Sequence, residues 1–288
     1  SPGASGNICC NVKALGVKDV FALTVLGEDW RGQILQRELR KNGIQLDHVI
    51  TSPERVTSTY IKPILCGWDS QQEDSRLDFV NYKPLPRTLE ERLIENVREV
   101  VPLVDAIIIE DQMVENGIIT DNVRNSLIKL AEKYPEKTFV ADSRVRIGLF
   151  SNMVLKPNRV EAVKAVYPSR NPREVDMDEL RKIGVKLQRR ARKPIYITLS
   201  EEGALLITES AQHHLPAAPT TPPIDPVGAG DTFIATVGAG LASGADPLEV
   251  GILANLAAGV VIKKLNQTGT ASPEEILRKY DEATRLKV

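Results

Sequence analysis

The chain has 288 residues, 37 basic against 38 acidic side chains and 42% hydrophobic residues, which is enough for a buried core without disulfide or metal support. Its formal net charge of −1 excludes the basic excess typical of nucleic-acid-binding proteins, and no run approaches the ~18 apolar residues of a membrane span. The cysteines Cys9, Cys10 and Cys66 have neither a disulfide framework nor a zinc spacing. We therefore expect a cytoplasmic protein that binds neither nucleic acid nor membrane.

Short apolar runs alternate with amphipathic stretches along most of the chain. The run 20–26 predicts a strand, and the helix that follows begins after Asp29 and ends at Asn42-Gly43. Further strands are predicted over 106–109, 138–141, 153–155 and 195–199, and helices over 89–100, 119–134, 159–167 and 177–191. Nearly continuous apolar strands between helices are typical of a parallel sheet covered on both faces. The predicted fold class is α/β, a three-layer sandwich with a mostly parallel central sheet.

Two regions depart from this alternation. The runs 59–65 and 77–80 flank a polar segment and predict a small β-hairpin outside the sheet, over about 58–82. The runs 204–208 and 212–215 predict antiparallel edge strands, and the chain after Pro226 is predicted to be helical, with caps at Asp246 and Ser272. Because no linker or repeat interrupts the pattern, we expect one domain over 1–288.

The strongest local signal is the segment 225–233, Asp-Pro-Val-Gly-Ala-Gly-Asp-Thr-Phe. Gly228 and Gly230 permit a tight turn with unshielded N–H groups, which at a helix N-terminus form an anion site. One interpretation is a simple glycine turn with an acidic residue at a helix start. Another is phosphoryl transfer, in which Gly228, Ala229 and Gly230 hold the phosphate and Asp231 accepts a hydroxyl proton. The segment lacks the third glycine of a dinucleotide-binding fingerprint. A Walker P-loop is excluded because Gly-Lys-Ser/Thr occurs nowhere in the sequence.

The same segment resembles the second signature of the ribokinase-like (PfkB) carbohydrate kinases. Other motifs follow in the order of that family, namely the glycine-containing opening 2–16 with Gly27, Asn158-x-x-Glu161, the turn 198–203, Asn255 with 257–259, and Gly269-Thr270. Because ordered motifs span the chain, it is identified as a member of this family. It is most similar to the kinase domain that acts on heptose 7-phosphate, through residues 76–79, 198–203 and 259–265. The opening departs from the family, because Gly3-Ala4 stands where two glycines are usual.

The resemblance implies ATP-dependent, Mg²⁺-requiring phosphorylation of a sugar or sugar-phosphate hydroxyl. In that reaction Asp231 orients and deprotonates the acceptor, and the amides of the turn stabilise the transferring phosphoryl group. A heptose 7-phosphate is the expected acceptor. The alternatives are a fructose, ribose or nucleoside acceptor, or a sugar- or nucleotide-binding protein that has lost catalysis.

For the acceptor, the resemblance assigns Gly3, Ala4 and Asn7 to the floor of the sugar site. The alternative for Asn7 is the N-cap of a helix over 8–15. Arg76 on the hairpin is suited to grip a phosphate that the sugar already carries. Its alternative is a surface salt bridge with Asp78 or Glu73.

Polar residues also follow two predicted strands, where open α/β sheets bind ligands. Asp111 follows the strand at 106–109, and Asp142 and Arg144 follow the strand at 138–141. We therefore expect Asp111 to bind substrate, and Arg144 is a weaker candidate.

For the nucleotide, Asn158 and Glu161 are one helical turn apart and, by the resemblance, organise water and Mg²⁺ around the phosphates. Their alternative is an N-cap with its capping glutamate. The resemblance places further residues beside the ATP, with Asn255 on the adenine side: Thr198, Ser200, Gly203 and Asn255. Asp225 resembles part of the monovalent-cation loop of some relatives, which implies a K⁺ site.

The hairpin corresponds to the lid that covers the sugar in this family, and in several relatives it also forms a dimer contact. Its apolar residues Ile61, Ile64 and Leu77 then face a second copy, or alternatively pack on their own hairpin. Relatives carry a first strand before the glycine signature, whereas this sequence begins at the signature. We therefore expect further N-terminal residues, absent here, to supply that strand.

Overall fold

A six-stranded sheet forms the centre of the molecule in the computed structural model, which describes residues 1–285. Its strands run in the order β12-β11-β10-β9-β8-β7, with bounds Gln212–Leu215, Ala204–Ile207, Ile195–Thr198, Val154–Leu155, Thr138–Ser143 and Ala106–Asp111. The pairs from β7 to β10 are parallel, and β11 and β12 are added antiparallel at one edge. The predicted α/β class with a mainly parallel sheet is confirmed, as are the antiparallel edge strands.

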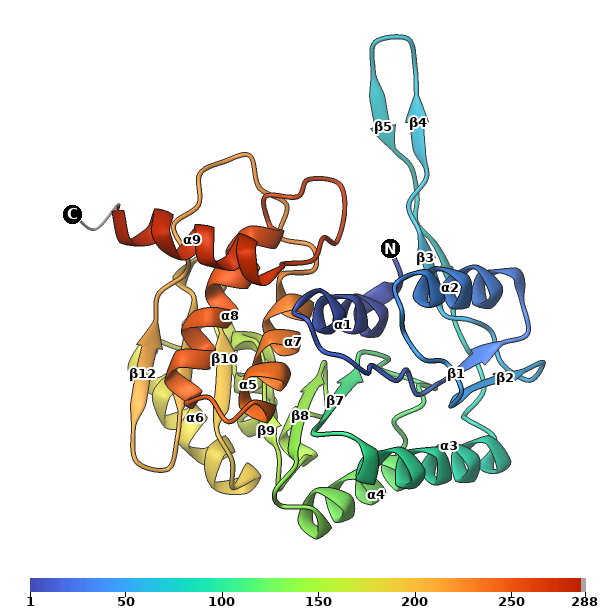
Figure 1. The fold of residues 1–288 in the computed structure, drawn as a ribbon, viewed down its shortest axis with the longest axis horizontal. Helices are drawn as coiled ribbons and strands as arrows, with labels where there is room; N and C mark the ends of the chain where they lie inside the picture. Colours follow the sequence, from blue (N-terminus) through green and yellow to red (C-terminus); the bar gives the residue numbers. More distant parts are fainter. Residues whose placement is uncertain (286–288) are drawn as a thin grey trace.

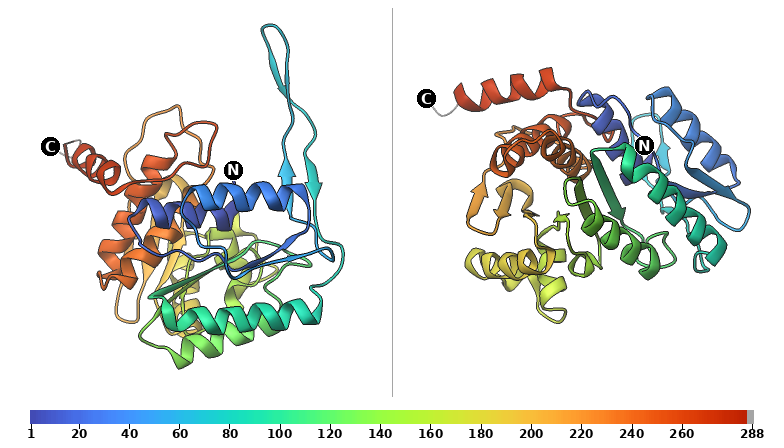
Figure 2. Two further views of the ribbon diagram at one scale, coloured as in Figure 1. Left: turned by 45° about the vertical axis from the view of Figure 1, so that its right-hand side comes forward. Right: turned by 60° about the horizontal axis from the view of Figure 1, so that its bottom comes forward.

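Helices cover both faces of this sheet (Figures 1 and 2). One face packs against α7 (Ala229–Ala242) and α8 (Pro247–Val261), with α1 (Gly3–Ala14) beside α7 and α9 (Pro273–Arg285) beside α8. The other face packs against α3 (Arg87–Val100), α4 (Asp121–Lys133), α5 (Arg159–Val166) and α6 (Met177–Ala191). Neighbouring strand residues divide between the two cores: Val140 and Tyr196 pack toward α7 and α8, whereas Phe139 and Ile197 pack toward the opposite helices. This explains why the strands are apolar at successive positions.

Among residues 1–285, no helix is both long enough and apolar enough to cross a lipid bilayer.

A separate parallel pair, β1 (Thr24–Gly27) with β2 (Val49–Ser52), lies beside the main sheet. The strand predicted over 20–26 is therefore shorter than expected, and β2 was not predicted. Val20 and Ala22 are buried in a small cluster with Leu39 and Ile44, so their apolar character reflects local packing. Asp29 caps α2 (Trp30–Lys41) as predicted, and its side chain accepts from the Gly32 amide at 2.9 Å.

The predicted hairpin is present and extends away from the body of the molecule (Figure 1). At its base β3 (Thr59–Ile61) pairs with β6 (Leu77–Phe79), and farther out β4 (Ile64–Cys66) pairs with β5 (Gln71–Glu73). The segment 69–75, predicted as a polar connection, therefore contains a strand. Residues of β4 are exposed throughout, and a ribbon without a buried face does not need the apolar alternation by which strands are recognised.

The structure excludes the alternative role of Asn7 as a helix N-cap. The helix begins at Gly3, after Pro2, so Asn7 lies inside it and is not the cap of a helix over 8–15. Gly3 has a φ of +74°, a left-handed conformation that glycine adopts without strain. The chain can therefore enter the helix five residues earlier than the side-chain pattern indicated.

Candidate active site

The segment 225–233 forms a turn that leads directly into α7. Gly228 has a φ of +85° and precedes the helix, and its carbonyl accepts from the Thr232 amide at 3.0 Å. A side chain on Gly228 would also crowd Thr268, whose Cβ would be 3.2 Å away. The next amides, those of Gly230 and Asp231, belong to the first turn of a helix and have no acceptor within it. Since Gly230 is exposed, the turn presents free donors to a ligand.

The carboxylate of Asp231 is held by α1. Asn7 is buried and donates from Nδ2 to Oδ2 of Asp231 at 2.8 Å, while its own Oδ1 accepts from the Thr268 hydroxyl at 2.9 Å. One turn farther along α1, Oδ1 of Asn11 accepts from the Thr232 hydroxyl at 3.0 Å. The structure thus brings together Asn7 and Asp231, which are 224 positions apart, and gives them fixed relative positions.

Gly3 and Ala4 form the first turn of the same helix, one turn before Asn7. Gly3 is exposed, and the space next to its Cα is open. The predicted sugar floor is therefore one surface at the start of α1, close to the turn that carries Asp231.

Ionisable side chains meet Asp231 from the carboxyl edge of the sheet. Glu110 and Asp142 are register partners at the ends of β7 and β8. Lys156, directly after β9, is buried and donates from Nζ to Oδ2 of Asp142 at 2.7 Å. A methyl group on Gly230 would lie 3.7 Å from that Nζ, so the ammonium group sits next to the glycine turn.

This cluster alters the protonation of its members. Burial, the hydrogen bond from Asn7 and the charge of Lys156 act on Asp231, and the effect of burial dominates, so its pKa is raised. Burial and the neighbouring Asp142 carboxylate raise the pKa of Glu110 well above its ordinary value. Oε2 of Glu110 and Oδ1 of Asp142 are buried and have no hydrogen-bond partner among the described residues.

Glu110 and Lys156 were missed in the sequence. The available signal was the one that singled out Asp111 and Asp142, because both follow apolar runs at the carboxyl edge of the sheet. Their proximity to Asp231 depends on strand order and on the placement of α7, which no local pattern specifies.

Asp111 is buried at the same edge, but protein groups occupy both of its oxygens. Arg146 donates from Nη2 to Oδ1 at 2.5 Å and from Nε to Oδ2 at 2.9 Å, and the Ser143 hydroxyl donates to Oδ2 at 2.6 Å. These contacts tie the loop after β8 to the end of β7. Contact between Asp111 and substrate stays a prediction. Arg144 is exposed, and its guanidinium donates to Oε1 of Gln112 at 3.0 and 3.1 Å.

Asn158 and Glu161 form the capping box at the start of α5. Oδ1 of Asn158 accepts from the Glu161 amide at 2.9 Å, and Oε2 of Glu161 accepts from the Asn158 amide at 2.8 Å. Burial and the Asp142 carboxylate raise the pKa of Glu161. Asn158 also lies against Thr198 in a parallel bridge, so two predicted nucleotide motifs are neighbours.

The turn after β10 and the loop after β12 are packed together. Gly203 has a φ of +89°, and a methyl group there would lie 2.1 Å from the Leu215 carbonyl oxygen, so only glycine fits. Asn255 is buried and donates to the carbonyls of Leu215 and Pro216, each at 3.0 Å. Ser200, at φ +55°, lies in the same turn. Gly203 and Asn255 thus hold the backbone around residues 215–217 from two sides.

The carboxylate of Asp225 joins the turn before α7 to the loop after α8. Its Oδ1 accepts from the Val227 amide at 3.1 Å and its Oδ2 from the Asn266 amide at 3.2 Å. Neither oxygen is left without a protein donor, so the carboxylate itself offers no orphaned group for a cation. The predicted K⁺ site stays a prediction.

Arg76 on the hairpin makes the salt bridge that was its alternative. Its Nε and Nη2 donate to the two oxygens of Asp78 at 2.6 and 2.7 Å, and its guanidinium lies 4.7 Å from the centre of the Tyr60 ring. Tyr60 in turn directs its hydroxyl toward Sδ of Met113, 3.7 Å away, in the loop after β7. The base of the hairpin therefore reaches the carboxyl edge of the sheet, whereas Arg76 is engaged within the hairpin.

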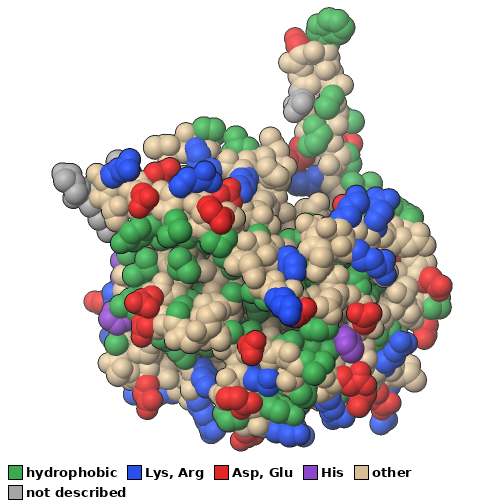
Figure 3. Space-filling view, in the orientation of Figure 1, with side chains coloured by type: hydrophobic (Ala, Val, Ile, Leu, Met, Phe, Trp, Pro, Cys, Tyr) green, Lys and Arg blue, Asp and Glu red, His purple; other side chains and the backbone are tan. Residues whose placement is uncertain are grey.

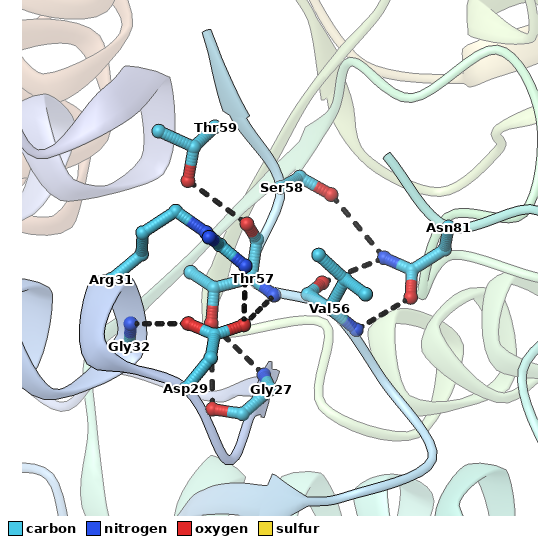
Figure 4. A network of polar contacts seen from close by, with 9 residues as sticks. All are labelled: Gly27, Asp29, Arg31, Gly32, Val56, Thr57, Ser58, Thr59 and Asn81. Carbon is cyan, nitrogen blue, oxygen red and sulfur yellow. Dashed lines mark hydrogen bonds and ion pairs between the residues drawn. The ribbon is translucent and has the colours of Figure 1, made fainter. Parts of the chain in front are cut away.

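The base of the hairpin is fixed by a polar network shown in Figure 4. Oδ2 of Asp29 accepts from the Thr57 amide at 2.9 Å and from Nη2 of Arg31 at 3.0 Å. Beyond the end of β6, the side chain of Asn81 accepts from the amide of Val56 at 2.9 Å and donates to its carbonyl at 2.8 Å. The first turn of α2 and both sides of the hairpin are thereby joined.

The sequence pattern of the pfkB family carbohydrate kinases matches residues 2–275. The bifunctional protein HldE of Pelobacter propionicus is 30% identical over 278 residues, which cover 96% of this chain and 54% of that protein. The bifunctional protein HldE of Gluconobacter oxydans is 29% identical over 279 residues, or 96% of this chain and 56% of the relative. The chain thus spans about half the length of the curated relatives it matches.

Solved structures of similar fold include two sugar kinases. Phosphofructokinase-2 from Escherichia coli in complex with substrates and products has a TM-score of 0.76 at 17% identity, covering 97% of this chain and 87% of that one. Ribokinase from Thermotoga maritima has a TM-score of 0.72 at 19% identity, with the same coverage of 97% and 87%. These similarities establish a ribokinase-like fold.

Proposed function

This chain belongs to the pfkB family of carbohydrate kinases, and we propose that it transfers the terminal phosphoryl group of ATP to a hydroxyl of a sugar phosphate, with heptose 7-phosphate as the acceptor class. The observation that carries the proposal is the position of Asp231. Its carboxylate is oriented by Asn7 at 2.8 Å and lies in the first helical turn after Gly228, beside the free amides of α7.

The chemistry follows from these neighbours. The oxygen of the acceptor hydroxyl forms a bond to phosphorus, the bond to the leaving ADP oxygen breaks, and the hydroxyl proton passes to Asp231. Amides at the start of α7 stabilise the charge on the transferring group because they are fixed before the reaction begins. Asn7 leaves Asp231 one well-defined orientation toward the start of α1.

The residues around Glu161 fit Mg²⁺. Burial and, after it, the carboxylate of Asp142 raise the pKa of Glu161, and Oδ1 of Asp142 is buried without a hydrogen-bond partner among the described residues. A divalent cation relieves such repulsion. We assign Glu161 to holding the ion through water, and the ion would neutralise charge on the ATP phosphates. Asn158, Thr198, Ser200, Gly203 and Asn255 are proposed to border the nucleotide.

The acceptor class rests on similarity to the HldE proteins, at up to 30% identity over nearly the whole chain. A fructose, ribose or nucleoside acceptor is the alternative. Gly3, Ala4 and Asn7 are proposed to line the sugar site, with the hairpin as its cover. Arg76 donates to both oxygens of Asp78. To bind a phosphate on the sugar, its guanidinium has to give up these hydrogen bonds.

An ADP-release assay with a panel of sugars and sugar phosphates tests the proposal. We expect turnover with ATP, Mg²⁺ and a heptose 7-phosphate, and turnover about 10²–10⁴-fold lower for Asp231→Asn with the same acceptor. If ribose, a nucleoside or fructose 6-phosphate is turned over faster than the heptose 7-phosphate, the proposed acceptor class is wrong and that compound takes its place. ATP binding without turnover on any acceptor would contradict the proposed reaction.

The hairpin is also proposed to form a dimer contact. Leu65 and Trp68 are 54% and 104% exposed, and hydrophobic side chains gather at the end of the hairpin in Figure 3. Light scattering should report a dimer that Leu65→Arg converts to a monomer. A wild-type protein that is monomeric at micromolar concentration would contradict this assignment.

A further inference from the structure

Among the described residues, Lys156 is the one cationic group that forms an ion pair with the acidic cluster of Glu110, Asp142 and Asp231. Its side chain is 5% exposed and its Nζ lies 2.7 Å from Oδ2 of Asp142. This ammonium group contacts Asp142, and its charge lowers the pKa values of Glu110 and Asp231 against the stronger effect of burial. Buried carboxylates in such numbers are unfavourable unless a cation compensates them.

The charged groups that face Asp231 can be named for each element packed against α7. Glu110 comes from β7, Asp142 from β8 and Lys156 from the residue after β9. The adjacent helices α1 and α8 contain one charged residue each. Lys13 of α1 binds the Lys18 carbonyl at 2.7 Å, and Glu249 of α8 is exposed. Of the charged groups named here, Lys156 is the one that brings positive charge next to the turn.

Lys156 also lies next to the backbone that presents Asp231. The residue before Asp231 is Gly230, where a methyl group would lie 3.7 Å from Nζ. A Cβ at residue 230 would therefore be in van der Waals contact with the ammonium group. Asp142 Oδ1 is buried without a partner, so Lys156 is the only described side-chain partner that fixes this carboxylate.

We infer that Lys156 is a positioning residue of the phosphoryl-transfer site, and that its ammonium group, anchored by Asp142 beside Gly230, is the internal counter-ion that keeps Asp231 in its charged form. The inference deepens the proposed function, because it rests on Asp231 being the base. Although burial opposes its charged form, the Asp142 carboxylate raises the pKa of Lys156. Its charge in turn opposes the rise that burial causes in the pKa of Asp231.

The test measures the protonation of Asp231 directly and involves no acceptor. Protein labelled with ¹³C at aspartate carboxyl carbons is titrated by NMR, and the Asp231 signal is assigned by its loss in Asp231→Asn. In Lys156→Met, which keeps side-chain length and removes the charge, we expect the proton affinity of Asp231 to rise about tenfold. Lys156→Arg, which keeps the charge, should retain most of the wild-type behaviour.

Two controls keep the result interpretable. Lys279→Met removes a lysine that pairs with Glu282 at 3.3 Å on α9, and it should leave the Asp231 titration unchanged. If Lys156→Met does not fold, the same change is made in the Asp142→Asn background, where no partner carboxylate is left unpaired. Lys156→Met/Asp142→Asn should then bind the Asp231 proton about tenfold more tightly than Asp142→Asn alone.

An Asp231 titration that is the same in wild type and in folded Lys156→Met would overturn the inference. So would a titration that moves equally in Lys156→Met and Lys156→Arg, because that result would assign the effect to packing. Neither outcome depends on turnover, so failure of the inference is distinguishable from failure of the kinase assignment, which the ADP-release panel tests.

Discussion

The ion pairs Lys156–Asp142 and Arg76–Asp78 have almost the same length, 2.7 and 2.6 Å, but they lie in opposite environments. The first is buried at the carboxyl edge of the sheet, with side chains 5% and 10% exposed. The second lies on the projecting hairpin, with side chains 54% and 38% exposed. Distance alone would rank them as equals.

The comparison shows that desolvation, and not the contact itself, decides what an ion pair does. At the sheet edge, removal of one partner leaves an uncompensated buried charge and alters the protonation of every neighbour. On the hairpin, water and salt screen the pair, so it contributes little to stability. The sheet edge is therefore suited to chemistry, and the hairpin to contacts that form and break.

The largest effect is expected at the buried edge, for Asp231→Asn. Turnover should fall about 10²–10⁴-fold, because the amide cannot accept the hydroxyl proton. Steady-state ADP release measures this, and binding of an ATP analogue, which should stay near wild type, serves as the control. Turnover within threefold of wild type would contradict the assignment of Asp231 as the base.

The next effect is on stability and compares the two pairs directly. Lys156→Met should lower the free energy of unfolding by about 3–5 kcal/mol, because Asp142 is left buried and unpaired. Urea titration measures it. Arg76→Met, the matched change in the exposed pair, should leave the unfolding midpoint nearly unchanged. Equal losses in the two variants would remove the distinction between the pairs.

The third effect is the pH dependence at the buried edge. Because burial raises the pKa of Asp231, the base is lost as pH falls through this raised value, and kcat/KM should fall tenfold per pH unit below it. The effect on stability has the opposite sign. The folded state binds the Asp231 proton more tightly than the unfolded state, so the free energy of unfolding falls as pH rises from the ordinary pKa to the raised one. Asp231→Asn should therefore unfold at a higher temperature than wild type at pH 7, by differential scanning calorimetry.

The smallest effect is expected at the hairpin pair. Arg76→Met should raise KM for a phosphorylated acceptor severalfold and leave kcat unchanged, because only binding to the sugar's own phosphate is lost. An unphosphorylated analogue of the same sugar is the matched control, and its KM should not change. Equal changes for both acceptors would show that Arg76 only supports the hairpin.

Much of the fold could be predicted, because strands buried on both faces and capped helices leave strong local patterns. Helix α6 was predicted with the bounds that the structure has, Met177–Ala191. The second half of the hairpin, β5, could not be, since a strand with no buried face has no apolar period.

The candidate site divides in the same way. The glycine turn and Asp231 could be predicted because a turn before a helix is a local pattern. Lys156 and Glu110 could not, since their roles arise from β7, β8 and β9 ending beside α7. Asp111 illustrates the limit of position alone: it lies at the expected edge, yet Arg146 and Ser143 occupy its carboxylate.

The network at the base of the hairpin has a mechanical consequence. Asp29 holds the start of α2 through Gly32 and the hairpin through Thr57, with one oxygen for each. Although burial opposes it, these two amide bonds lower the pKa of Asp29, so the joint stays charged at neutral pH. Asp29 therefore couples the position of the hairpin to that of α2. A tilt of the hairpin must therefore move α2 with it or break one of these two hydrogen bonds. The exposed hairpin and the helix are thus expected to move together.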